Sequence, residues 1–163
     1  GDVYKGQWMG TLSKTLSGMG GYIAGESALI DNLRNLSPGF LYSVGISAPI
    51  AAAALESLKI MQEEPERIES LHRISQHFLE QAKRRQLDTG YSIGEAIIPV
   101  ILGSSLRAAK ASEYLFKHGF NVQPILYPAV PEKNARLRFF LNSEHTKQQV
   151  DDCLDLIEKF NKS

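Results

Sequence analysis

Several features that would define a protein class are scarce or missing in this 163-residue sequence. Cys153 is its only cysteine, so no internal disulfide framework can form, and a reducing compartment such as the cytoplasm is expected. No apolar run is long enough to span a membrane, and the first residues carry no signal-peptide pattern. Lys plus Arg equals Asp plus Glu at 18 each, so no charge excess favours nucleic acid or an anionic membrane as a partner.

The sequence also offers little material for a metal site or a nucleophilic thiol. His72 and His77 lie five residues apart in a helical stretch and do not share a helical face, so a solvated face is expected there and no metal site. Cys153 lies in another helical pattern, where a buried structural thiol is expected and not a nucleophile.

The most informative run is GTLSKTLSGMGGYIAG, residues 10–25, which places Lys14 between an apolar strand-like segment and a glycine cluster. A lysine that attaches to a carbonyl cofactor needs an ordered amine, partly shielded from water so that its pKa falls toward neutrality. Hydroxyls at Thr11 and Ser13 can bind an anionic group beside that amine, and glycines let the backbone turn or approach a ligand. The run therefore predicts a pyridoxal phosphate lysine with part of its phosphate cup.

Two other interpretations of this run stay open on residue types alone. Lysines beside hydroxyls are common in surface loops, and the glycine cluster could be only a turn between two strands. A nucleotide-binding P-loop fits less well, because Ser13 stands where that motif requires glycine.

Hydrophobic periodicity and turn residues predict an α/β chain in two parts. In the first part we expect strands over 7–12 and 21–24, a helix over 28–36 capped by Ser27, and a helix over 49–63. The second part opens with a helix to about residue 85, whose apolar face comprises Ile68, Leu71, Ile74, Phe78 and Leu79. Strands over 97–102, 121–126 and 136–141 then alternate with a helix over 104–118, stopped by Gly119, and a last helix to about 160, opened by a Thr146–Gln149 capping box. The predicted domains are 1–63 and 64–163.

Arg136 and Arg138 are the candidate anion-binding residues of the second part. Strand alternation puts both on one face, with Leu137 and Phe139 on the other. A planar guanidinium matches a carboxylate bidentately and could hold the α-carboxylate of an amino acid. A surface salt bridge is the alternative for either arginine.

Three motifs, in the right order, resemble the α-oxoamine synthases, which are fold-type-I pyridoxal phosphate enzymes. They are the lysine run, then FLYS followed by AAAAL at 40–43 and 51–55, and then ARLRF with His145-Thr146 and a closing helix. The resemblance implies that residues 1–63 are the C-terminal remnant of a cofactor-binding large domain with a linker helix, and that 64–163 form a small α/β domain. It also implies that the chain matches only the C-terminal portion of these enzymes.

The resemblance assigns roles to individual residues. Lys14 would hold pyridoxal phosphate and move the substrate's α-proton, Thr11 would bind the phosphate, and Arg138 would bind the substrate carboxylate, with Arg136 structural. Where the family places a Ser or Thr that reaches the partner subunit's phosphate, this chain has Val44 and Gly45, and Ser43 is the nearby hydroxyl.

By the same resemblance, the intact enzyme would condense an amino acid with an acyl-CoA or acyl-carrier-protein thioester, as a homodimer. We expect the chain by itself to bind pyridoxal phosphate weakly or not at all, to be inactive, and to self-associate through exposed strand edges. Two alternatives remain: an aminotransferase or lyase of the same fold, and a catalytically silent folding or dimerisation module.

Overall fold

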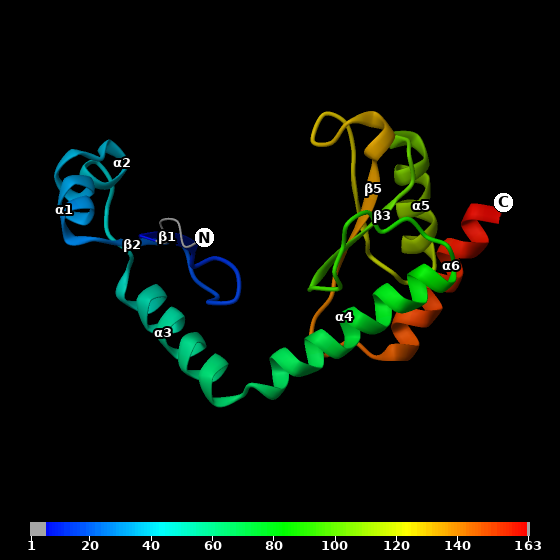
Figure 1. Ribbon diagram of the computed structural model, residues 1–163, viewed down its shortest axis with the longest axis horizontal. Helices are drawn as coiled ribbons and strands as arrows, with labels where there is room; N and C mark the ends of the chain where they lie inside the picture. Colours follow the sequence, from blue (N-terminus) through cyan, green and yellow to red (C-terminus); the bar gives the residue numbers. More distant parts are fainter. Residues whose placement is uncertain (1–5, 163) are drawn as a thin grey trace. The chain divides into compact units, whose positions relative to one another are not determined.

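The computed structural model describes residues 6–162 and separates into two compact units at the boundary between Pro65 and Glu66 (Figure 1). The sequence placed this division after residue 63, in the same stretch between two helices. Each unit is described by itself below.

The first unit pairs a β-hairpin with three helices. Strands β1 (Gln7–Thr11) and β2 (Gly21–Gly25) are antiparallel, with Gln7 opposite Gly25 and Thr11 opposite Gly21. Gly21 is required by close packing, because a Cβ there would lie 2.6 Å from the carbonyl oxygen of Gly10. The helices that follow are α1 (Ser27–Leu36), α2 (Pro38–Leu41) and α3 (Ala48–Glu63).

This first unit has almost no hydrophobic core of its own. Among its described residues Ala54 is the one buried hydrophobic side chain. Many large apolar side chains are instead exposed: Trp8, Met9, Met19, Tyr22, Ile23, Leu36, Phe40, Leu41, Tyr42, Val44, Ile46, Leu55, Leu58 and Ile60. A two-stranded hairpin is marginal in water without a packed face. The unit therefore presents apolar surface that the described residues leave uncovered.

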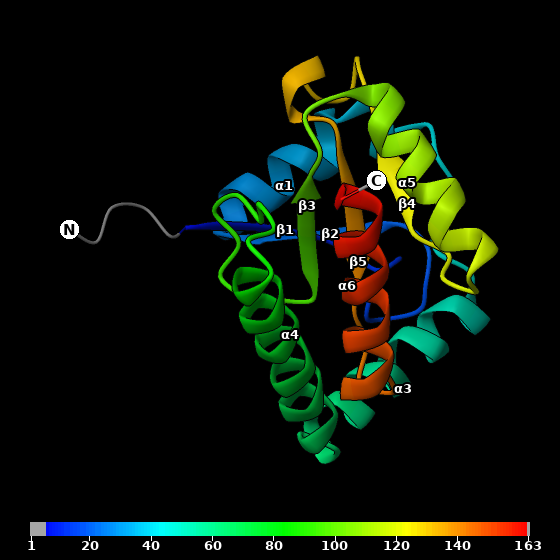
Figure 2. The same cartoon turned by 90° about the vertical axis from the view of Figure 1, so that its right-hand side faces the viewer.

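The second unit is a two-layer α/β sandwich. Its antiparallel sheet has the order β3-β5-β4, formed by β3 (Ile97–Ile101), β5 (Arg136–Phe140) and β4 (Gln123–Ile125). Helices α4 (Glu66–Arg84), α5 (Ser105–Lys117) and α6 (Lys147–Lys162) cover one face of this sheet, as Figure 2 shows. A short 3-10 helix, η1 (Glu132–Asn134), lies between β4 and β5. The expected α/β class is confirmed.

A continuous hydrophobic core joins the sheet of the second unit to its helices. Ile98, Leu137 and Leu154 are fully buried in it, and the rings of Phe78 and Phe139 lie 4.8 Å apart between centroids. The predicted alternation in β5 is confirmed, since Leu137 and Phe139 face the helices while the arginines do not. One face of the sheet thus holds the core, and the other carries the arginines.

Two local signals were interpreted correctly at the helix ends. Thr146 and Gln149 form the predicted capping box: the Thr146 N–H donates to Gln149 Oε1 at 2.9 Å, and the Gln149 N–H donates to Thr146 Oγ1 at 3.2 Å. Gly119 follows α5 with φ of +89°, the left-handed conformation that ends many helices.

Other expectations were wrong. Ser27 does not cap α1, because it already belongs to the helix; Glu26 occupies the cap position in an extended conformation and makes no side-chain cap hydrogen bond. His77 is not on a solvated face: only 15% of its side chain is exposed, and its Nε2 lies 3.0 Å from Asp151 on α6, which packs against α4. Ile68 is 44% exposed, since the core covers α4 only from Ile74 onward.

No helix among residues 6–162 combines the length and the apolar character needed to cross a lipid bilayer.

Candidate functional site

The lysine loop, residues 12–20, joins the two strands of the hairpin and is ordered by its own backbone. The Leu12 N–H donates to Gly20 O at 3.0 Å, and the Gly18 N–H donates to Leu12 O at 2.7 Å. A turn at its tip places the Ser17 N–H 3.0 Å from Lys14 O. These bonds fix the backbone of Lys14 while leaving its amine with no hydrogen-bond or ion-pair partner among residues 6–162.

The Lys14 side chain is exposed. The sequence predicted partial shielding from water, and within the described residues that shielding is not provided. Among the described residues, the side chains of Ile46 and Ile50 approach this loop at its glycines, and the small core of the first unit leaves the Lys14 side chain in solvent. Shielding of the Lys14 amine from water would therefore depend on polypeptide or ligand outside these residues.

The Thr11 hydroxyl lies at the base of this loop and is already engaged. Its Oγ1 is 2.7 Å from Ser13 Oγ, accepts the Ser13 N–H at 3.2 Å, and donates to Gly20 O at 3.3 Å. The bond to Gly20 is long, so exchanging it for a charge-assisted bond to an anion would cost little. The Thr11 and Ser13 hydroxyls thus form one small polar cluster beside the lysine loop.

A groove of about 920 Å³ lies along the hairpin of the first unit. Thr11 contributes to its wall, together with Tyr22 from β2, and α1 and α2 supply Leu33 and Phe40. Its lining is mostly apolar, and Arg34 is the one charged side chain among the described residues that line it. Tyr22 and Arg34 carried no sequence signal of their own, because neither suggests a chemical role by its residue type and neighbours.

Ser43 lies in the loop that follows α2, and its exposed hydroxyl donates to Phe40 O at 3.3 Å. The chain then returns to the lysine loop: a Cβ on Gly20 would lie 3.6 Å from the Ile46 side chain. Ser43 and the lysine loop therefore belong to neighbouring segments of the first unit. Val44 is 95% exposed and supplies no substitute hydroxyl.

The two candidate arginines of β5 differ in their contacts. The Arg136 Nε–H donates to Asn134 O at 2.7 Å, which is a structural use of its guanidinium. Arg138 is exposed and stacks over the Phe140 ring at 4.8 Å, and it has no carboxylate partner among residues 6–162. Its guanidinium is thus available for an added carboxylate, whereas that of Arg136 is partly used.

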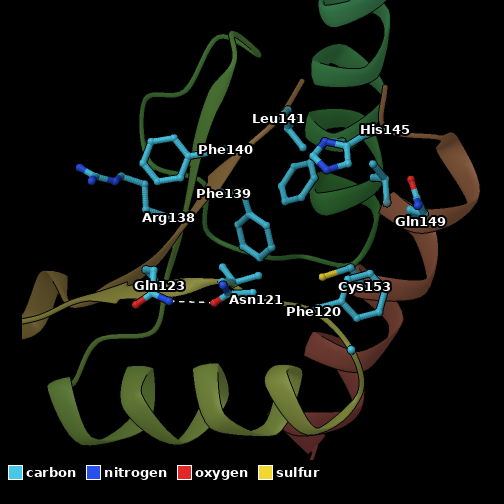
Figure 3. A pocket seen from close by; sticks show the side chains of 14 residues that line it. Phe120, Asn121, Gln123, Arg138, Phe139, Phe140, Leu141, His145, Gln149 and Cys153 are labelled. Carbon is cyan, nitrogen blue, oxygen red and sulfur yellow. Dashed lines mark hydrogen bonds between the residues drawn. The ribbon is translucent and has the colours of Figure 1, made fainter. Parts of the chain in front are cut away.

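Arg138 also contributes to a cavity of about 390 Å³ in the second unit, which Figure 3 shows from close by. Asn121, Gln123, Phe140 and His145 line it as well, and Figure 3 shows Arg138 at the opposite end from His145 and Cys153. The cavity lies just before β4: the expected strand over 121–126 pairs with β5 only from Gln123 onward. The sequence did not indicate that Asn121, Gln123 and His145 lie around one cavity with Arg138. Strand alternation could have placed Phe140 on the same face as the arginines.

Cys153 lies at the inner wall of this cavity, 5% exposed, and burial raises the pKa of its thiol to about 12 from 9.0. The sequence prediction of a buried thiol is confirmed. At a pH below 9 the folded chain carries about a thousandfold less thiolate than the unfolded chain, since the two pKa values differ by about three.

We expect a thiol reagent at pH 8 to label Cys153 only as the second unit unfolds, and the labelling rate should rise steeply in urea. Equal rates for native and denatured chains would contradict this.

No group of three or more His, Cys, Asp or Glu side chains within residues 6–162 is arranged to hold a metal ion. His72 lies 3.6 Å from Glu95, and His77 contacts Asp151, so the two histidines serve different contacts.

Comparison with known proteins links these observations. The profile of the family "aminotransferase class I and II" matches residues 4–157. The 8-amino-7-oxononanoate synthase of Thermosipho melanesiensis is 41% identical over 154 residues, which is 94% of this chain and 39% of that protein. Among solved structures, the 8-amino-7-oxononanoate synthase of Francisella tularensis has a TM-score of 0.84 at 24% identity, covering 94% of this chain and 45% of that one. A serine palmitoyltransferase solved with PLP, pyridoxal phosphate, has a TM-score of 0.87 at 21% identity, covering 96% of this chain and 40% of that one.

The chain thus spans about two fifths of the length of the relatives that it matches. Within that span the match is nearly complete, and it includes the lysine loop, the helices and the β5 arginines. The two structural likenesses establish a fold-type-I arrangement over this span. The chain belongs to the aminotransferase class I and II family, as a partial homologue of the α-oxoamine synthases.

Proposed function

We propose that this chain carries the lysine and the carboxylate-binding arginine of a PLP-dependent acyltransferase, which condenses an amino acid with an acyl thioester. The thioester would be an acyl-CoA or an acyl-carrier protein. The observation that carries the proposal is the lysine loop: its backbone is held by internal hydrogen bonds, hydroxyls flank it, and its amine has no partner among residues 6–162. The 41% identical relative, named 8-amino-7-oxononanoate synthase, supports the reaction class.

The residues present fit two parts of PLP, its aldehyde and its phosphate. The donor set at the lysine loop comprises one unpartnered amine and two neighbouring hydroxyls, Thr11 and Ser13. Gly21 keeps the backbone close at the base of the loop, where a Cβ would not fit. An aldehyde-bearing phosphate needs an amine and anion-binding donors of this kind. Lys14 would hold the cofactor covalently, with Thr11, and Ser43 across a dimer interface, as phosphate donors. When bound, PLP supplies an electron sink for the carbon that loses a proton.

The chain's own residues would then divide the work. With the amino acid bound, the Lys14 amine would be free to take the α-proton and return it. Arg138 would orient the amino acid through its carboxylate by a bidentate contact, with Phe140 holding the guanidinium from below. Arg136 would stay structural, through its bond to Asn134 O.

Each of the two units would correspond to a domain of the complete enzyme. Residues 1–63 would be the C-terminal part of a large domain with its linker helix, and 64–163 the small α/β domain. The apolar surface of the first unit supports this, since such a surface needs further polypeptide or a second subunit to cover it. We infer a cytoplasmic homodimer for the complete enzyme, and weak PLP binding without turnover for the 163 residues alone.

Fusion to a relative tests the function. We would join the corresponding N-terminal portion of the Thermosipho melanesiensis synthase to this chain, and measure thiol release from an acyl-CoA in the presence of amino acids. Turnover that needs both PLP and an acyl thioester is expected. A folded fusion that binds PLP yet releases no thiol with any acyl donor would contradict the acyltransferase assignment.

An aminotransferase is the second candidate, because the matching family profile covers that reaction. It would use the same lysine and arginine but no acyl donor. In the same fusion, an aminotransferase would convert PLP to its amine form when an amino acid is added. Adding a keto acid would then restore PLP. A fusion that folds as a dimer with neither activity would indicate the silent folding or dimerisation module.

The difference between the two β5 arginines gives a paired prediction. In the active fusion, Arg138→Lys should raise the KM for the amino acid while leaving the spectrum of the bound cofactor unchanged, since lysine cannot reproduce the bidentate fork. The expected loss is about 1.5–3 kcal/mol, typical of a charge-assisted hydrogen bond. Arg136→Lys is the matched control on the same strand and should change KM little. Equal effects of the two substitutions would mean that Arg138 is not the carboxylate ligand.

A further inference from the structure

The loop between β4 and β5, residues 126–135, is tied to the start of α5 by one acidic side chain. Glu132 Oε1 accepts the Ser105 N–H at 2.7 Å, and Glu132 Oε2 accepts the Ser105 hydroxyl at 2.5 Å. The same Ser105 Oγ accepts the Tyr127 N–H at 3.2 Å. Ser105, Tyr127 and Glu132 are called the latch below. Figures 1 and 2 show this loop and η1 beside the beginning of α5.

The latch is the loop's principal tie to the rest of the second unit. The other hydrogen bonds made by residues 127–133 stay inside the loop: the Val130 N–H donates to Leu126 O, and Pro131 O and Glu132 O accept the N–H groups of residues 134 and 135. Within the described chain, every bond from residues 127–133 to another element therefore passes through Ser105. The loop's far end is held separately, because Ala135 O accepts the Leu102 and Gly103 N–H groups.

Apolar packing does little to hold this loop in place. Tyr127 is 68% exposed, and Pro128, Ala129, Pro131 and Lys133 are exposed as well. The carboxylate of Glu132, in contrast, faces the first turn of α5, where the free N–H groups and the helix dipole favour a negative charge. Hydrogen bonds from Ser105 lower the pKa of Glu132, which shows that they favour its charged form.

We propose that the latch is a conformational device: closed, it holds residues 127–133 against α5, and it can open without unfolding the sheet. Opening would free the loop between two fixed points, the end of β4 and Ala135. This inference does not depend on the proposed function. The loop's position is thus set by the hydrogen bonds of Glu132 with Ser105 and not by packing in the hydrophobic core.

Amide hydrogen exchange on the full chain tests this, with Glu132→Ala compared against Glu144→Ala. Glu144 is the matched control, an exposed glutamate in another loop: its backbone N–H donates to Asn142, and its side chain has no partner in the part of the chain that the structure describes. In Glu132→Ala the Tyr127 and Ser105 amides should exchange on the order of tenfold faster or more, since two charge-assisted bonds are lost. The Leu137 and Phe139 amides should keep their native rates.

A second pair of variants separates the latch from general destabilisation. Ser105→Ala removes the acceptor of the Tyr127 N–H and one of the two bonds to Glu132, so the Tyr127 amide should exchange faster while the amide of residue 105 stays bonded to Glu132 Oε1. Ser105→Thr keeps the hydroxyl and should restore slow exchange. Unchanged Tyr127 exchange in both Glu132→Ala and Ser105→Ala would overturn the proposal. So would an equal acceleration at Tyr127 and Leu137, because the latch would then open only when the whole unit unfolds.

Discussion

Replacing Lys14 by alanine is expected to abolish covalent attachment of PLP. The test uses the fusion with a synthase N-terminal portion. Before reduction, the visible absorbance of covalently linked PLP should be present in the unsubstituted fusion and absent in Lys14→Ala. After borohydride reduction, PLP should stay attached to the unsubstituted fusion and not to Lys14→Ala. The reason is position: Lys14 is the lysine whose backbone is held between the Thr11–Ser13 hydroxyls and the glycine cluster. Peptide mass mapping after reduction locates the modified residue.

Lys59→Ala provides the control for this test. Lys59 is also an exposed lysine of the first unit, but it lies in α3 and pairs with Glu56 at 3.4 Å. Its substitution should leave attachment and turnover unchanged. Attachment that persists in Lys14→Ala, or is lost equally in Lys59→Ala, would remove Lys14 from its proposed role, and activity would have to be explained by another amine.

The second large effect is expected on stability. Phe78→Ala should destabilise the second unit by about 3–5 kcal/mol, the usual cost of deleting a buried phenyl ring and leaving a cavity. Phe78 is 1% exposed and packs against Phe139 at the centre of the contact between α4 and the sheet. This loss is a large fraction of the stability of an ordinary domain. Urea unfolding followed by far-ultraviolet circular dichroism measures the shift.

Phe116→Ala is the matched control, a phenylalanine on α5 that is 67% exposed. Its substitution should change the free energy of unfolding by roughly 0.5 kcal/mol or less. Similar shifts for both variants would mean that the core does not lie where the structure places it. The thiol of Cys153 gives an independent measurement of the same transition, because it is buried in the same core.

Local patterns predicted the elements of the second unit well, for a physical reason. The apolar residues of α6 recur at helical spacing, and its capping box is a contact between residues three apart, so both are written in short stretches of sequence. The arginine face of β5 follows from the twofold alternation of a strand in the same way. Such features depend on neighbours along the chain and need no knowledge of tertiary packing.

Errors arose where a distant segment decides the environment. His77 was placed in solvent, yet Asp151 of α6, far along the chain, contacts it. The latch had no sequence signal, because Ser105 and Glu132 are ordinary surface residue types that only the chain path brings together. The sequence likewise did not predict that β4 begins only at Gln123, where the cavity beside Arg138 lies.

The sequence by itself determined the chemistry of the candidate site: an amine among hydroxyls and glycines at Lys14, and two guanidinium groups on one strand face. These follow from residue identity and local periodicity. Only the folded chain shows how the contacts of the two arginines differ, since Arg136 donates to the Asn134 carbonyl while Arg138 stacks on Phe140 with no carboxylate partner among residues 6–162. Tertiary structure also decided that Lys14 is exposed, because shielding requires surrounding elements, and the first unit supplies almost no core to provide it.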